Sequence, residues 1–240
     1  METLLEVFIS MRLRLSIATI VSVLFVDQAL KLWIKLSKPL GESVSVIGDI
    51  FYLHFIENPG MAFGLEFGGE AGKLALSLFR IVAIIGIGWY LRRIIKEGVP
   101  SGLIVAASLI FAGAFGNIID SAFYGLIFDK GSVWNGHYYE SYLGISELTN
   151  LGNGYTGFLK GNVVDMLYFP LLEGNFPDWF PIWGGEHFLF FRPVFNIADA
   201  SITVGVLMII LWQKRYFRKS LLAEESEKEI DQEGLSTQSP

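Results

Sequence analysis

Residues 193–212 read PVFNIADASITVGVLMIILW, a stretch that is long and apolar enough to cross a lipid bilayer as a helix. Asp199 interrupts this stretch near its beginning. An ionisable side chain in such surroundings is costly, so it is a candidate for function by default. A second aspartate, Asp165, lies in another apolar stretch, GNVVDMLYF, at residues 161–169. The two acids together suggest a reaction that needs two carboxyl groups.

Four stretches in all approach the length of a membrane span, and we expect helices over residues 13–36, 73–91, 101–120 and 194–212. The chain of 240 residues is 52% hydrophobic and only 18% charged, whereas soluble domains carry about 25% charged residues. A signal peptide is the alternative for the first stretch, but no small-residue cleavage site follows it. The sequence therefore predicts an all-α membrane protein with four transmembrane helices.

The basic residues are distributed asymmetrically around these helices. They cluster before the first helix, after the second and after the fourth, which are all on one side of a four-helix topology. Because loops rich in Lys and Arg stay in the cytoplasm, we expect both termini to be cytoplasmic. The loops at 37–72 and 121–193 would then lie on the opposite, outer side. Residues 1–222 would form a single domain, and the polar tail at 223–240 is expected to be disordered.

Composition excludes several kinds of site. The chain has no cysteine, so it has no disulfide, thiol nucleophile or thiolate metal site. Its histidines, His54, His137 and His187, lack metal-ligand spacing, and we expect neither a metal nor a cofactor. No serine lies in a GxSxG-like elbow, and no basic surface favours binding of nucleic acid. These exclusions favour an aspartic-protease arrangement, in which two carboxyl groups share one proton and activate water.

The other polar residues of the apolar segments gather near the outer ends of the helices. Asp27 and Lys31 are four residues apart, so they share a helix face and can pair. Asn117 and Asp120 are three residues apart near the end of the third helix, and Asn196 lies near the start of the fourth. A purely structural role stays open for the Asp27–Lys31 pair and for the two asparagines, because such residues also link helices by hydrogen bonds.

The outer loops carry signals of their own. The stretch FYLHFIEN at 51–58 is rich in aromatic and β-branched residues, which favour a strand, and its last residue, Asn58, begins an Asn-Pro-Gly turn. The aromatic clusters between Pro170 and Phe191 are typical of a segment at the membrane–water boundary. We therefore expect a loop subdomain close to the outer membrane surface.

Five short blocks occur in order along the chain: DQALK at 27–31, NPGMAFG at 58–64, GAFGNIID at 113–120, GNVVDM at 161–166 and FNIADASITVG at 195–205. They resemble the signature blocks of lipoprotein signal peptidase, also called signal peptidase II. The resemblance extends from about residue 12 to residue 214 and covers all four expected helices. A single N-x-x-D motif carries little information, whereas five ordered blocks on a four-helix topology are highly specific.

The resemblance implies an aspartic endopeptidase of the bacterial inner membrane, which cleaves diacylglyceryl-modified prolipoproteins before the lipidated cysteine. It implies that Asp165 and Asp199 are the catalytic pair, that the first outer loop forms a small β-cradle, and that the cyclic peptide globomycin inhibits the enzyme. We also expect a monomer whose partners are lipidated prolipoproteins and membrane lipid. The supporting residues that the resemblance implies are Asp27, Lys31, Asn58, Gly60, Asn117, Asp120 and Asn196.

Two features depart from the family pattern. Ser121 stands where the family usually has an arginine, directly after the acid of the first G-N-x-x-D block, and a cation there would stabilise the neighbouring carboxylates. Arg192 is a speculative substitute, whereas Arg80, about two turns into its helix, is expected to snorkel toward the interface. The segment at 129–160 is also longer than the family normally shows.

Three alternatives stay open at this point. The motif G-N-x-x-D occurs at 116–120 and again at 161–165, so Asp120 competes with Asp165 for a place in the pair, although order and spacing favour Asp165. A small ion- or proton-coupled transporter is the alternative function, and it predicts repeat symmetry and polar residues throughout the membrane depth. A catalytically inactive protein that binds lipoproteins is a third reading, suggested only by the missing arginine.

Overall fold

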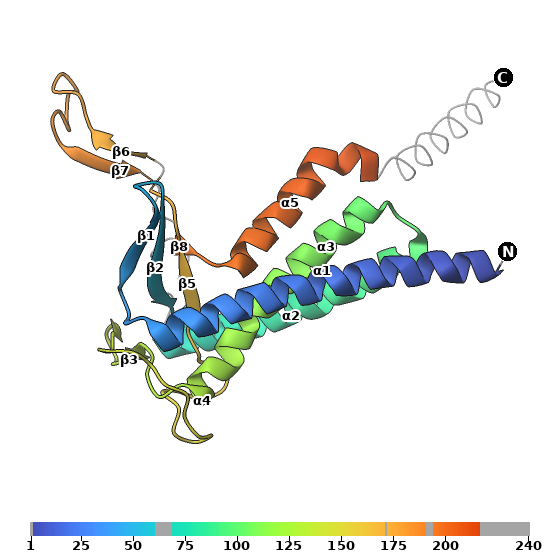
Figure 1. Cartoon of the computed structure of the whole chain (residues 1–240), viewed down its shortest axis with the longest axis horizontal. Coiled ribbons are helices and arrows are strands. Elements are labelled where there is room, and N and C mark those ends of the chain that lie inside the picture. Colours follow the sequence, from blue (N-terminus) through green and yellow to red (C-terminus); the bar gives the residue numbers. More distant parts are fainter. Residues whose placement is uncertain (1, 61–68, 171, 191–193, 217–240) are drawn as a thin grey trace, which may run out of the picture.

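The computed structural model describes residues 2–60, 69–170, 172–190 and 194–216. Long helices run alongside one another, and a small sheet lies at the end of α1 that is remote from the N-terminus (Figure 1). The first two long helices and the stretch Ser101–Ile127 are each long and apolar enough to cross a membrane. The apolar part of the last helix, Ile197–Gln213, is shorter. The fourth span therefore stays a prediction. The long helices are α1 (Glu2–Ser37), α2 (Gly69–Glu97), α3 (Ser101–Ile119) and α5 (Ile197–Tyr216).

Helix ends differ from the expected ones for local reasons. The first helix begins at Glu2, because the segment before residue 13 contains no glycine or proline to interrupt it. The last helix begins at Ile197 rather than at 194, because Val194–Phe195 pairs as a strand, β8, with another strand. Asp199 is therefore the third residue of α5 and lies about 3 Å along its axis, instead of the roughly 8 Å that a start at 194 implies.

The central helix of the molecule is α3, which packs against α1, α2 and α5. Small residues permit close approach of the backbones, since a methyl group at Gly113 would lie 2.2 Å from the carbonyl oxygen of Ala198 on α5. The helix continues into a π-helical turn, η1 (Asp120–Tyr124), and the short α4 (Gly125–Ile127). Such π-helical turns frequently occur at functional sites. This one begins at Asp120, one of the predicted site residues.

The loops at 37–72 and 121–193 both contribute to one antiparallel sheet. The strand predicted at 51–58 is confirmed, and it lies between a strand of its own loop and a strand of the second loop. In this register Ile56 pairs with Asp165 and Asn58 pairs with Val163. A helical membrane protein with a small sheet is thus confirmed, whereas the shape of a cradle stays a prediction. In sheet order the strands are β1 (Ser43–Ile47), β2 (Phe51–Asn58), β5 (Val163–Tyr168) and β8 (Val194–Phe195).

The rest of the second outer loop forms two small hairpins. One belongs to the 129–160 segment, which hydrogen-bonds to the helices through Thr149 N–H and the Ile127 carbonyl. The other projects from the sheet (Figure 1), and the turn between its strands exposes Trp179 and Ile182. Arg192 and the tail at 223–240 lie outside the described residues. The hairpin strands are β3 (Val133–Trp134), β4 (Tyr139–Glu140), β6 (Leu172–Asn175) and β7 (His187–Phe190).

Candidate active site

Asp165 lies on β5, in a part of the strand whose residues are all buried. Its own exposed fraction is 1%. Two side-chain amides donate to its carboxylate: Asn196 Nδ2 to Oδ1 at 2.7 Å, and Asn58 Nδ2 to Oδ2 at 3.3 Å. The strand pairing explains the second contact, because β2 ends at Asn58 beside the start of β5. Asp165 is thus removed from water and oriented by hydrogen bonds from two different elements.

Asp199 lies in the first turn of α5 and is half-buried. Asn196 caps this helix, since its Oδ1 accepts the N–H of Asp199 at 2.8 Å. The carboxylate of Asp199 accepts a hydrogen bond from Asn117 Nδ2 at 2.7 Å. A carboxylate in the first turn is also favoured by the positive end of the helix dipole. The helix start therefore fixes both the position of Asp199 and a favourable site for its charge.

Two asparagine side chains connect the two acids. Asn196 Nδ2 donates to Asn117 Oδ1 at 3.1 Å, while each amide also donates to one acid. The resulting chain of contacts runs Asp165–Asn196–Asn117–Asp199 and joins β5, α3 and α5. Both asparagines therefore contact the acids, beyond the linking of helices that was left open from sequence. Burial, and then the charge of Asp199, raise the pKa of Asp165 to about 8.

Buried charges lie next to this chain. Lys31 Nζ lies 2.9 Å from Asp27 Oδ2 and 2.8 Å from Asp120 Oδ2, and all three side chains are fully buried. Lys31 also donates to Asn117 Oδ1 at 3.0 Å. Asp27 and Asp120 also accept hydrogen bonds from the backbone beside Asp199 and Asp165. Asp27 Oδ1 accepts the N–H of Ala198 at 2.8 Å, and Asp120 Oδ2 accepts the N–H of Val164 at 3.2 Å. The Asp27–Lys31 pair is therefore part of a larger cluster that holds the segments on which Asp165 and Asp199 lie.

Gln28 is a member of this cluster that the sequence did not single out. Its Nε2 donates to Asp120 Oδ1 at 2.9 Å and to Asp27 Oδ2 at 3.1 Å, and its Oε1 accepts from the Tyr124 hydroxyl at 3.2 Å. Its place inside the DQALK block was the available signal. Ser121 is also buried, but its hydroxyl donates to the carbonyl of Asn117 at 3.1 Å. No charge is supplied at that position.

Gly60 controls the orientation of Asn58. Its N–H donates to Asn58 Oδ1 at 2.9 Å, so the amide nitrogen of Asn58 is left to face Asp165. Gly60 adopts a φ of +104°, and an added methyl group would lie 2.8 Å from a side-chain carbon of Leu76. Both the backbone conformation and the space therefore favour glycine. The structure thus brings all nine predicted site residues into one connected region.

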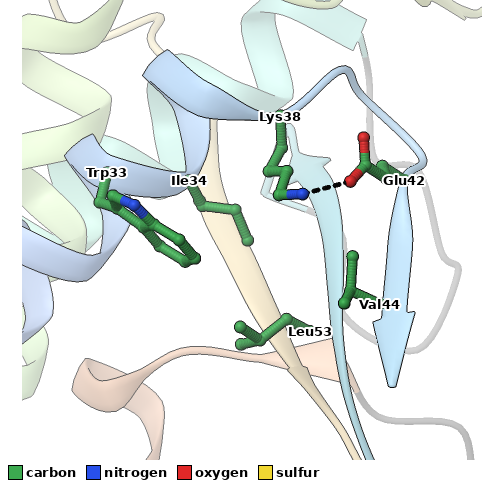
Figure 2. A pocket seen from close by; sticks show the side chains of 6 residues that line it. All are labelled: Trp33, Ile34, Lys38, Glu42, Val44 and Leu53. Atoms are coloured by element: carbon green, nitrogen blue, oxygen red, sulfur yellow. Dashed lines mark hydrogen bonds and ion pairs between the residues drawn. The ribbon is translucent and has the colours of Figure 1, made fainter. Parts of the chain in front are cut away.

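Two further observations concern a metal site and a cavity elsewhere in the described chain. Among the described residues, no group of three or more His, Asp or Glu is arranged to hold a metal ion. A separate cavity of about 270 Å³ lies between the end of α1 and the β1–β2 hairpin, as Figure 2 shows. None of the predicted site residues lines it. Its walls are Trp33, Ile34, Val44 and Leu53, with Lys38 and Glu42 paired across one side (Figure 2).

Comparison with known proteins agrees with the sequence blocks. The family described as signal peptidase (SPase) II matches residues 19–214. The lipoprotein signal peptidase of Porphyromonas gingivalis is 46% identical over 199 residues, which cover 82% of this chain and 82% of that protein. The lipoprotein signal peptidase of Amoebophilus asiaticus is 35% identical over 216 residues, which cover 88% and 83% of the two chains. The transporter alternative finds no support in these matches.

One solved structure extends the likeness to the fold. It is described as a bacterial membrane enzyme determined by the in meso method at 1.9 Å resolution, and it is 26% identical with a TM-score of 0.51. The likeness covers 82% of this chain and 90% of that one. The family match begins within α1, ends within α5, and includes α2, α3, the four-stranded sheet and both acids. This chain therefore belongs to the signal peptidase II family and is an aspartic peptidase of a membrane.

Proposed function

We propose that this protein cleaves the signal peptide from diacylglyceryl-modified prolipoproteins, with Asp165 and Asp199 as its catalytic pair. The observation that carries the proposal is the chain of contacts in which two asparagine amides join the two carboxyl groups. Such a pair can share one proton, so that one member is an acid and the other a base at the same pH. The names of the relatives support the choice of substrate.

The raised pKa of Asp165 makes it the holder of the shared proton. Asp199 then removes a proton from a water molecule, whose oxygen attacks the carbonyl carbon of the scissile peptide bond. Asp165 gives its proton to the carbonyl oxygen, and a tetrahedral intermediate forms. When the carbon–nitrogen bond breaks, Asp199 passes its proton to the leaving nitrogen and Asp165 recovers one from the intermediate's hydroxyl. The pair thus returns to its starting state.

The remaining site residues serve this pair in different ways. Asn117 and Asn196 hold the carboxyl groups by direct hydrogen bonds, and Asn58, oriented by Gly60, contributes a third amide. The buried cluster of Asp27, Lys31 and Asp120 fixes the backbone on which the acids lie. Positioning of this kind contributes to catalysis because small displacements of reacting groups slow reactions strongly.

The proposed location is the bacterial inner membrane, with four spans, cytoplasmic termini and the catalytic pair near the outer face. The charge asymmetry of the loops supports this orientation. So does the sheet, because it lies beyond the end of α1 and carries Asp165 (Figure 1). A substrate that is anchored by lipid would then present its cleavage site at the depth of the pair. We also propose a monomer, a β-cradle beside the substrate, and inhibition by globomycin.

The test is cleavage of a lipidated prolipoprotein in detergent or vesicles by the wild type, Asp165→Asn and Asp199→Asn. Each variant should lose essentially all turnover, because residues that act as a unit are not additive. Asp49→Asn is the matched control, since Asp49 is an exposed acid in the turn between β1 and β2. Near-full turnover by either catalytic variant would refute the pair, and an inactive wild type would refute the substrate.

A further inference from the structure

The catalytic region contains more acid than base. Asp27, Asp120, Asp165 and Asp199 are linked through hydrogen bonds to one buried cation, Lys31. If the catalytic pair shares one proton, three ionised carboxylates face a single ammonium group. Buried charges without partners are costly, and an excess of negative charge opposes ionisation of the catalytic pair. A further cation close to the pair would relieve this.

Position 121 does not supply that cation, because Ser121 turns its hydroxyl to a backbone carbonyl. The nearby lysines already serve other groups. Lys35 pairs with Glu57, and Lys73 donates to Asn162 Oδ1. Within the part of the chain that the structure describes, the remaining basic side chain near the acids is Arg80 on α2.

Arg80 lies on the face of α2 that is turned into the protein. Helical spacing places it with Lys73, Ser77 and Ile84, all of which are buried. Ser77 donates to the carbonyl of Leu159 at 2.9 Å, so this face lies against the segment that leads to β5. The neighbouring positions Phe79 and Val82 are each 69% exposed and form the outer face of the helix. Arg80 itself is half-buried.

This placement differs from the snorkelling side chain expected from sequence. The charge of Arg80 interacts with the carboxylates of Asp199, Asp165 and Asp120, most strongly with Asp199. Among the described residues, Arg80 forms none of the ion pairs within 4.0 Å. It therefore acts on the acids through its electrostatic field and not through a direct clamp.

We propose that Arg80 is a positioning residue of the peptidase, which supplies from α2 the positive charge that keeps one member of the Asp165–Asp199 pair ionised. The inference rests on the proposed catalytic pair and adds a residue to it. It also accounts for Ser121, because the charge expected beside Asp120 reaches the same carboxylates from a different helix. Arg80 thus supplies the positive charge that an arginine at position 121 would supply, although it does so from a different position in the chain.

The expected pH profile of cleavage takes account of every charged group that faces the Asp165–Asp199 pair. Among the groups beside the pair, Arg80 is permanently charged, Lys31 and Lys35 are held in ion pairs, and Lys73 is hydrogen-bonded to Asn162. Removal of Arg80 should therefore raise the pKa of Asp165 further and move the pH profile of cleavage toward higher pH. The groups are Asp27 and Lys31 on α1, Glu57 on β2 with its partner Lys35, Lys73 and Arg80 on α2, Asp120 on η1, Asp165 on β5 and Asp199 on α5.

The test is the pH dependence of kcat/KM for prolipoprotein cleavage by the wild type, Arg80→Gln and Arg80→Lys. The glutamine variant should shift both limbs of the profile toward higher pH by about one unit, so that cleavage falls about tenfold on the acidic side and little at neutral pH. The lysine variant keeps the charge and should stay close to the wild-type profile. Arg92→Gln is the control, because Arg92 is an exposed residue near the opposite end of the same helix.

Each outcome bears on one hypothesis. An Arg80→Gln profile that is lowered equally at every pH, or a lysine variant that behaves like glutamine, would overturn the role of the charge. A profile indistinguishable from the wild type would also overturn it. Asp199→Asn is measured in the same assay, and if that variant still cleaves, the catalytic pair itself is wrong. Failure of the two hypotheses is therefore distinguishable.

Discussion

Lys31 and Lys35 lie one turn apart on α1, and both are fully buried, but they belong to different regions of the molecule. Lys31 contacts two carboxylates, Asp27 and Asp120, and an asparagine that bridges the proposed catalytic pair. Lys35 contacts one carboxylate, Glu57, and the carbonyl of Lys130 in the second outer loop. The same residue type on the same helix face thus supports the proposed chemistry at one position and the fold of a loop at the other.

The region around Lys35 connects four segments that are distant in sequence. Glu57 Oε2 accepts from the Ser132 N–H and from Asn162 Nδ2, each at 2.7 Å. Asn162 Nδ2 also donates to the Ser132 carbonyl at 2.8 Å. Lys35 Nζ lies 4.9, 5.2 and 5.4 Å from the ring centroids of Phe128, Tyr142 and Tyr155, respectively. These contacts hold the 129–160 segment against α1 and β2, so this network has a structural task.

The largest expected effect is a difference in cleavage activity between variants of Lys31 and Lys35. Lys31→Met leaves Asp27 and Asp120 without their cation and should lower cleavage by about 100-fold or more, because both acids hold backbone beside the catalytic pair. Lys35→Met is the matched variant one turn away, and its folded fraction should cleave within a few-fold of the wild type. The measurement is kcat/KM per folded enzyme. Equal losses in the two variants would show that the two networks are not separate.

The second-largest expected effect is a loss of stability when Lys35 is replaced. Lys35→Met leaves Glu57 buried without its cation and should lower the free energy of unfolding by about 3 kcal/mol. The double variant Lys35→Met, Glu57→Gln removes both charges and keeps an amide that can serve Ser132 and Asn162, so it should regain at least half of this loss. Thermal unfolding in detergent measures both. A double variant that is less stable than Lys35→Met would contradict a charge-pairing account.

The two regions were not equally visible in the sequence. Asp27, Lys31, Asn117 and Asp120 lie in short blocks, and their polar character inside apolar helices marks them individually. Glu57 lies on β2 and Asn162 in the GNVVDM block, both between the apolar helices where polar residues are ordinary, and they meet only because β2 and β5 pair. The Lys35 network therefore could not be read from local patterns. What identifies it is tertiary contact between segments separated by about a hundred residues.

Helix ends and helix contacts show the same limit. Val194 and Phe195 are apolar and fit a strand as well as a helix, and only pairing with β5 decides between them. Gly113 lacks a side chain, which lets α5 approach α3, and only the packing of these helices reveals its role. The inward face of Arg80 likewise depends on how α2 packs, which apolar periodicity left undetermined. Packing decided each of these, whereas the order of the four long helices followed from hydropathy.

A smaller expected effect is a pH-dependent difference in stability between variants of two acids, Asp165 beside the proposed pair and Asp129 near Lys35. The raised pKa of Asp165 means that its contribution to stability is lost as the pH rises through about 8. The difference in Tm between the wild type and Asp165→Asn should therefore fall by a few degrees between pH 6 and pH 9. Burial raises the pKa of Asp129, but hydrogen bonds from Glu147 N–H and the Ser146 hydroxyl together lower it overall. Asp129→Asn should thus show a constant difference over this range, and a slope equal to that of Asp165→Asn would remove the assignment to Asp165.

The smallest effect comes from a third lysine, just beyond the end of α1. Lys38 Nζ lies 2.5 Å from Glu42 Oε1, but the two side chains are 30% and 32% exposed, in contrast to the buried pairs at Lys31 and Lys35. Water and salt screen such a pair, so Lys38→Met should change the free energy of unfolding by less than about 1 kcal/mol. Cleavage should stay at the wild-type rate, because Lys38 lines the separate cavity of Figure 2 and contacts no site residue. Thermal unfolding of all three lysine variants side by side tests whether burial sets the order. A loss at Lys38 as large as that at Lys35 would mean that the cavity, and not desolvation of the charges, governs stability at this end of the helix.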